Sequence, residues 1–127
     1  MNSALRNQVH EFDGVRVFEC ASGGPLLRTP QDAVELIGLA GTYKVSLFAI
    51  PVARLGDDFF RLETRLAGEF LQKFVTYGFR VAIVGDVSIY FGDGRALRSF
   101  VAESNRGRHI WFVADLGELR SRVEASS

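Results

Sequence analysis

The chain has 127 residues, of which 47% are hydrophobic and 24% are charged, and its fifteen basic residues balance fifteen acidic ones. This length leaves room for one hydrophobic core, so we expect a single domain over residues 1–127, with its core between about residues 8 and 125. Balanced charge provides no overall field to attract a phosphate backbone or an anionic membrane. Neither nucleic acid nor a membrane is therefore an expected partner.

A single cysteine, Cys20, excludes an intramolecular disulfide and a cysteine-based metal cluster. His10 and His109 lie far apart in the sequence, and neither has the spacing of a metal ligand, so we expect no metal and no cofactor. Residues 1–10 are polar, and no apolar run approaches the roughly 18 residues that a membrane span needs. These features predict a cytoplasmic protein without a signal peptide.

In chain order, the first two predicted elements form a β-hairpin. Residues 8–12 and 15–21 have strand-like patterns. Between them, Asp13-Gly14 is a strong hairpin signal, because both residues tolerate positive φ.

A first helix is predicted from Thr29 to about Ala40. Thr29 is a suitable N-cap, and Pro30 suits the first helical position. Gly41 is expected to end this helix in the left-handed conformation.

The rest of the chain alternates short apolar runs with helical patterns. The runs predict buried strands at 44–51, 79–87 and 109–114, and helices are predicted at 64–77, 95–105 and 117–125. Such alternation indicates right-handed βαβ crossovers and a parallel sheet. The predicted fold class is α/β: an N-terminal β-hairpin, then alternating βα units, with a mostly parallel five-strand sheet flanked by about four helices.

One predicted helix has two possible starts, Asp57 and Thr64. A start at Asp57 places Glu63 in the middle of an apolar stripe, where an unpaired carboxylate is costly. We favour the start at Thr64, which leaves a wide apolar band on the helix. Leu66 and Phe70 belong to this band, and we expect them to contact a protein partner or a second copy of the chain in a homodimer.

Three segments resemble a known family: LAGEFLQKF at 66–74, AIVGD at 82–86 and SNRGR at 104–108. They occur in the family's order, and the similarity covers about residues 10–120. The chain therefore resembles the bacterial domain-of-unknown-function family 4180 (DUF4180). This resemblance implies a fold and a length, and it adds no catalytic residue.

A more distant resemblance is to STAS-like domains, the fold of anti-sigma-factor antagonists, which also combine an opening β element with βα units. In those domains the helix after the third strand begins with Ser or Thr, then a small residue and a Leu. Thr64-Arg65-Leu66 occupies that place. The resemblance therefore implies that Thr64 is the position of regulatory phosphorylation, although Arg65 stands where glycine would be more typical.

Thr64 has two interpretations. As a phosphoacceptor it would present a phosphate to the free N–H groups and the positive dipole end of the helix, with Arg65 nearby as a partner contact. As a plain N-cap it would stabilise the helix by about 1 kcal/mol. We favour the plain N-cap.

Three carboxylates are candidates for a general acid or base. Glu63 and Glu69 would serve if a pocket raised their pKa, although an ion pair with Lys73 is the simpler interpretation of Glu69. Asp86 follows the fourth strand at its carboxyl end, where open parallel sheets place ligands. In the alternative interpretation, Asp86 stabilises its own loop through Ser88.

Arg106 and Arg108 would present two guanidiniums to an anion or an acidic partner. Alternatively, these cations complement the dipole at the end of the preceding helix, with Asn105 or Gly107 in the left-handed conformation.

Cys20 is expected in the core. Trp111 and the pair Phe59 and Phe60 are expected there too.

The leading hypothesis is a non-enzymatic, STAS-like regulatory or interaction module that binds a protein partner, or itself, through the helix at Thr64 and the adjoining loops. The alternative is a small-molecule-binding protein or a cofactor-independent enzyme, with an aromatic pocket and Asp86, Glu63 or Glu69 as its polar group. A closed pocket of at least about 300 Å³ around one of these carboxylates would favour the alternative.

Overall fold

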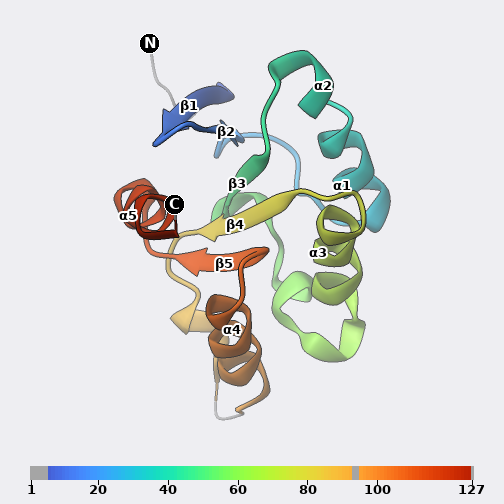
Figure 1. The fold of residues 1–127 in the computed structure, drawn as a ribbon. Coiled ribbons are helices and arrows are strands. Elements are labelled where there is room, and N and C mark those ends of the chain that lie inside the picture. Colours follow the sequence, from blue (N-terminus) through green and yellow to red (C-terminus); the bar gives the residue numbers. More distant parts are fainter. Residues whose placement is uncertain (1–5, 93–94, 127) are drawn as a thin grey trace.

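The computed structural model describes residues 6–92 and 95–126, and a five-strand sheet lies at its centre (Figure 1). The strands follow one another across the sheet in chain order: β1 (Gln8–Phe12), β2 (Val15–Glu19), β3 (Leu47–Pro51), β4 (Arg80–Val84) and β5 (Ile110–Val113). β1 is antiparallel to β2, and the other neighbours are parallel. The predicted α/β class, the opening hairpin and the mostly parallel sheet are confirmed.

The turn of the hairpin consists of Asp13 and Gly14. Their φ angles are 50° and 83°. Phe12 pairs with Val15, so the loop between the strands has only these two residues. Two successive residues with positive φ form the turn geometry that matches strand twist, which explains why an Asp-Gly pair stands here.

In the described part of the chain, four helices of eight or more residues cover the two faces of the sheet. α1 (Pro30–Ile37), α3 (Leu66–Thr76) and α4 (Ala96–Arg106) pack on one face, and α5 (Leu116–Ser126) packs on the other. Figure 1 shows α1 and α3 on the side of the sheet opposite α5. Right-handed crossovers that progress in one direction place their helices on one face, and α5 follows the last strand without such a crossover. No helix of the described residues is long and apolar enough to cross a membrane.

The central strands supply side chains to both faces. Phe48 and Ile50 of β3 pack with α1, α3 and α4, while Leu47 and Ala49 lie beneath α5. All four side chains are fully buried. A strand that is covered on both faces reads as a continuous apolar run, as this one does in the sequence.

The start of α1 agrees with the prediction. Thr29 Oγ1 accepts a hydrogen bond from the N–H of Asp32, and the Asp32 carboxylate accepts one from the N–H of Thr29. Pro30 is the first helical residue. This reciprocal capping satisfies two N–H groups that would otherwise lack a partner at the helix end.

The predicted left-handed stop at Gly41 is wrong. Gly41 lies within a one-turn helix, α2 (Ala40–Tyr43), and the left-handed residue is Lys44, with φ of 56°. The ring of Tyr43 packs edge-on against Phe18 of β2, with ring centres 5.2 Å apart. This extra turn is therefore held by a contact between distant parts of the chain, which no local pattern reveals.

Candidate functional site

Two loops meet beyond the carboxyl ends of β3 and β4. The first contains three short 3₁₀ turns, η2 (Val52–Arg54), η3 (Asp57–Phe60) and η4 (Leu62–Thr64), and the second contains η5 (Ser88–Tyr90). Open parallel sheets place their ligands at this edge. Residues 57–66 and 86–91 are called the carboxyl-edge surface below.

Two buried phenylalanines hold the first loop against the core. Phe59 and Phe60 are almost fully buried, and the ring of Phe59 lies edge-on to Phe70 of α3, with ring centres 5.5 Å apart. Large buried rings anchor a backbone segment strongly. The long helix from Asp57 does not form, and Glu63 lies exposed on the surface of the loop.

Thr64 is not the N-cap of α3, so that prediction is wrong. The helix begins at Leu66, and its capping residue is Arg65, which has a left-handed backbone with φ of 64°. Thr64 Oγ1 lies 2.9 Å from the carbonyl oxygen of Asp58 and 2.8 Å from that of Arg61, and it accepts a hydrogen bond from the N–H of Leu66. The hydroxyl therefore acts as a donor that closes the loop, a role that a phosphate oxygen does not fill.

An aromatic stack joins the two loops. The rings of Phe60 and Tyr90 lie 4.2 Å apart and almost parallel, at 10°. Desolvation of the Tyr90 hydroxyl and the neighbouring Asp57 carboxylate raise the pKa of Tyr90, so this phenol stays neutral. The stack fixes the position of η5 against η3.

Beside the stack lies Ile89, which is 74% exposed. Arg61 lies on the same surface, where it forms an exposed ion pair with Asp58 at 3.2 Å. Arg61 lines each of three surface hollows at this edge, of about 340, 310 and 210 Å³. This surface thus places the exposed Ile89 and the Phe60–Tyr90 stack beside Arg61, with shallow hollows around that arginine. The same ranges also contribute exposed charged residues: Arg65, Asp57, Asp58, Glu63 and Asp86.

Asp86 ties its own loop. Its carboxylate accepts a hydrogen bond of 2.9 Å from the N–H of Ser88. Hydrogen bonds from the side chain and the backbone of Ser88 lower the pKa of Asp86, so the group is ionised at neutral pH. The geometry matches the loop-closing interpretation, and a carboxylate with a lowered pKa is a poor general base.

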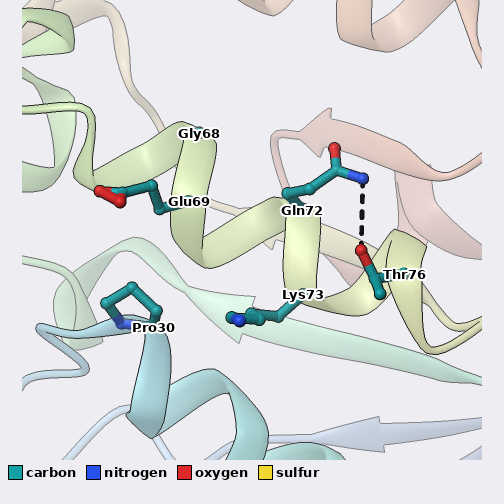
Figure 2. Close-up of a pocket in the computed structure, with 6 residues that line it drawn as sticks. All are labelled: Pro30, Gly68, Glu69, Gln72, Lys73 and Thr76. Carbon is teal, nitrogen blue, oxygen red and sulfur yellow. Dashed lines mark hydrogen bonds between the residues drawn. The ribbon is translucent and has the colours of Figure 1, made fainter.

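Glu69 lines a different hollow, of about 460 Å³, between α3 and the start of α1 (Figure 2). The expected ion pair with Lys73 is absent from the ion pairs of residues 6–92 and 95–126, and Figure 2 shows the two side chains apart. Gln72 donates a hydrogen bond to Thr76 on the same wall. Exposed residues make up most of the lining, so the hollow is an open groove rather than a closed pocket.

The interior offers no polar site among the described residues. Every buried residue there is apolar or is Cys20, and no buried side-chain N or O atom lacks a hydrogen bond. Burial raises the pKa of the Cys20 thiol to about 12, which keeps it protonated. No group of three His, Cys, Asp or Glu side chains in that part of the chain is arranged to hold a metal.

The apolar band expected on α3 is mostly core. Phe70 is 0% exposed and contacts Phe59 and Phe74, so its predicted role in partner binding is wrong for the folded chain. Leu66 is half-buried and lines the 340 Å³ hollow. The band is wide because α3 packs against the sheet, α1 and the 3₁₀ loop together.

Arg106 and Arg108 do not line the same hollow. Arg106 pairs with Glu103 on the exposed side of α4, whereas Arg108 lines a hollow beside β4. The prediction of a left-handed residue at the end of α4 is also wrong, because neither Asn105 nor Gly107 has a positive φ. The side chain of Asn105 instead turns back and bonds β5.

Sequence reasoning missed the residues that shape the carboxyl-edge surface most. No sequence motif includes Tyr90, Ile89 or Arg61. Their positions depend on two loops that are distant in the sequence. A weak signal was present: Ile89 is a large apolar residue in a segment that belongs to no predicted strand or helix. Loops carry a disproportionate share of binding residues.

The fold and this surface define an α/β protein in which a hairpin opens a sheet whose strands follow chain order. The chain belongs to the family described as Domain of unknown function (DUF4180), whose model matches residues 12–123. This match confirms the resemblance drawn from the three sequence segments. Comparison with the curated proteins and with the solved structures gives no match.

Proposed function

We propose that this chain is a non-enzymatic, STAS-like regulatory or interaction module that binds a protein partner through the carboxyl-edge surface. The observation that carries the proposal is the placement of Ile89. Its side chain is the most exposed large hydrophobic group of the described residues, and it stands beside Tyr90 and Arg61. Covering one such side chain completely is worth about 1.5–3 kcal/mol.

The composition of this surface suits a protein interface. Tyr and Arg are enriched among the residues that dominate binding energy, and aromatic residues are enriched at interface cores. The Phe60 ring holds Tyr90 in place before any partner arrives. A side chain that is already fixed loses little conformational freedom on binding.

The backbone at Arg65 adds support. A left-handed conformation costs a residue other than glycine roughly 1–2 kcal/mol, and Arg65 adopts it with its side chain exposed. Such strain concentrates at binding and switch regions. We propose that Arg65 and the half-buried Leu66 contact the partner at the margin of the surface.

The small-molecule alternative finds less support. Ligand pockets enclose most of their ligand, whereas the groove beside Glu69 is open and Glu63 and Asp86 are exposed.

We also place the module in the cytoplasm, because a single cysteine that stays protonated and buried suits a reducing compartment.

Affinity capture with quantitative mass spectrometry tests the proposal. Wild-type protein, Ile89→Asp and the control Tyr77→Asp are compared; Tyr77 is 56% exposed but lies beyond the carboxyl-edge surface. We expect at least one protein whose capture falls about tenfold or more in Ile89→Asp and is unchanged in Tyr77→Asp. The same preparation reports whether the Thr64 peptide carries phosphate.

Two further outcomes have defined meanings. Circular dichroism first establishes that both variants are folded. If folded Ile89→Asp captures the same proteins as the wild type, the proposed surface is wrong. If sedimentation shows a dimer that Ile89→Asp dissociates, the partner is a second copy of the chain.

A further inference from the structure

The hollow lined by Arg108 lies at the end of the parallel sheet opposite the carboxyl-edge surface. Its volume is about 220 Å³, and it is lined by Arg80, Arg108, His109 and Ser126. Arg80 is the first residue of β4, and Arg108 and His109 directly precede β5. The amino ends of two neighbouring parallel strands therefore bring these three basic side chains together, although 28 residues separate Arg80 from Arg108.

The guanidinium of Arg80 is held in place. Its Nε donates a hydrogen bond of 3.0 Å to the carbonyl oxygen of Arg108, and its Cζ lies 4.4 Å from the centre of the Trp111 ring. Arg122 approaches the same ring at 4.6 Å and donates to the carbonyl oxygen of Asn105. Cation–π contacts and hydrogen bonds to carbonyl oxygens fix these cations without neutralising their charge.

This group of cations has no carboxylate partner in the part of the chain that the structure describes. The ion pairs there involve His10, Arg61, Arg106 and Arg120 instead. Burial, together with the positive charge of Arg108, lowers the pKa of Arg80. Like charges held close together without a counter-ion favour the binding of an anion.

We propose that this hollow, the amino-end hollow, is a binding site for the phosphate group of a small molecule. Arg80 and Arg108 supply guanidinium donors whose planar fork matches phosphate oxygens, and His109 supplies a ring N–H. A phosphate monoester carries nearly two negative charges at neutral pH, so it balances two guanidiniums better than a single carboxylate does. The volume is below the range of about 300–1,000 Å³ for drug-sized ligands and suits one phosphate with a small substituent.

The site is independent of the proposed protein interface. It uses none of residues 57–66 or 86–91, and it lies at the other end of strands β4 and β5. It also differs from the anion site expected from sequence, because Arg106 is absent from its lining and Arg80 takes its place.

Calorimetric titration with inorganic phosphate, at constant ionic strength, tests the proposal. Arg108→Gln removes one exposed guanidinium of the site, and Arg106→Gln removes a neighbouring exposed guanidinium that faces Glu103. Both variants change the net charge equally. We expect the Kd for phosphate to rise about tenfold or more in Arg108→Gln and less than about twofold in Arg106→Gln.

A second measurement locates the ion. The indole N–H of Trp111 donates to the carbonyl oxygen of Gly107, next to Arg108, so its proton resonance should shift with phosphate in the wild type and not in Arg108→Gln. Absence of phosphate binding at millimolar concentration overturns the proposal. An equal loss of phosphate affinity in both variants also overturns the proposal, because binding would then follow net charge. The proposal is likewise overturned if the protein prefers duplex DNA to phosphate and both variants weaken DNA binding equally.

Discussion

The two ends of the parallel sheet are built in different ways. At the carboxyl end, buried phenylalanines anchor a long loop, Arg61 is paired with Asp58, and the outstanding feature is an exposed apolar side chain. At the amino end the turns are short, and the outstanding feature is Arg80 and Arg108 without a carboxylate partner among the described residues. Exposed apolar surface is stabilised by a large apolar partner, whereas unpaired cations are stabilised by an anion.

The difference teaches that one five-strand sheet can present two chemically distinct surfaces although the interior formed by the described residues is apolar. No charged residue in the described part of the chain is fully buried, and the core is apolar on both faces of the sheet. Because the exposed side chains of these loops lie outside the core, the surface chemistry of the loops can vary without loss of the fold.

The largest expected change in the free energy of unfolding comes from the buried rings that hold the loop at the carboxyl end. Phe70→Ala removes a fully buried ring that contacts Phe59, and it should lower the free energy of unfolding by about 3–5 kcal/mol. Ile89→Ala should change that free energy by less than about 0.5 kcal/mol. Urea denaturation measures both, and similar losses in the two variants would contradict the assignment of one residue to the core and the other to the surface.

A smaller effect is expected near the amino end. Asn105 accepts a hydrogen bond of 2.7 Å from the N–H of Phe112 and donates one of 3.2 Å to its carbonyl oxygen, so it covers part of the open edge of β5. Asn105→Ala should lower the free energy of unfolding by about 1–3 kcal/mol. It should also weaken phosphate binding, because residues 105–109 lose their attachment to the sheet.

The matched control for that variant is Glu103→Ala, an exposed change on the same helix. Its effect on unfolding should stay below about 0.5 kcal/mol. If Asn105→Ala behaves like this control in urea denaturation, the side-chain bonds to β5 do not hold the edge.

The smallest expected change in the free energy of unfolding has the opposite sign, because the substitution stabilises the fold. Arg65→Gly should raise the free energy of unfolding by about 0.5–1 kcal/mol, since glycine adopts a φ of 64° without strain. Arg65→Ala keeps a Cβ and should give no such gain. If Arg65 contacts the partner, Arg65→Gly will also reduce capture while it stabilises the fold; thermal unfolding and the capture assay measure the two effects separately.

Much of the fold was predictable from local patterns. Asp13-Gly14, the Thr29 cap and the apolar run at 44–51 each satisfy a rule that acts over a few residues. The start of α3 was missed by two residues, because a left-handed Arg65 is not favoured by any local preference and is held by the loop around it.

The candidate sites were less predictable. Asp86 was placed correctly at the carboxyl end of β4, since its position follows from the strand before it. Phe70 was assigned to the surface because a helical pattern shows how wide an apolar band is, but not how many elements cover it. The joint placement of Phe60 with Tyr90, and of Arg80 with Arg108, was not foreseen.

By itself, the sequence determined the alternation of strands and helices, the hairpin and the Thr29 cap, because these depend on neighbouring residues and on the period of apolar side chains. Only the tertiary structure decided which loops meet at each end of the sheet, which phenylalanines are buried, and which arginines have no carboxylate partner among residues 6–92 and 95–126. Those properties depend on strand order and register. They bring together residues whose separation along the chain carries no information about their distance in space.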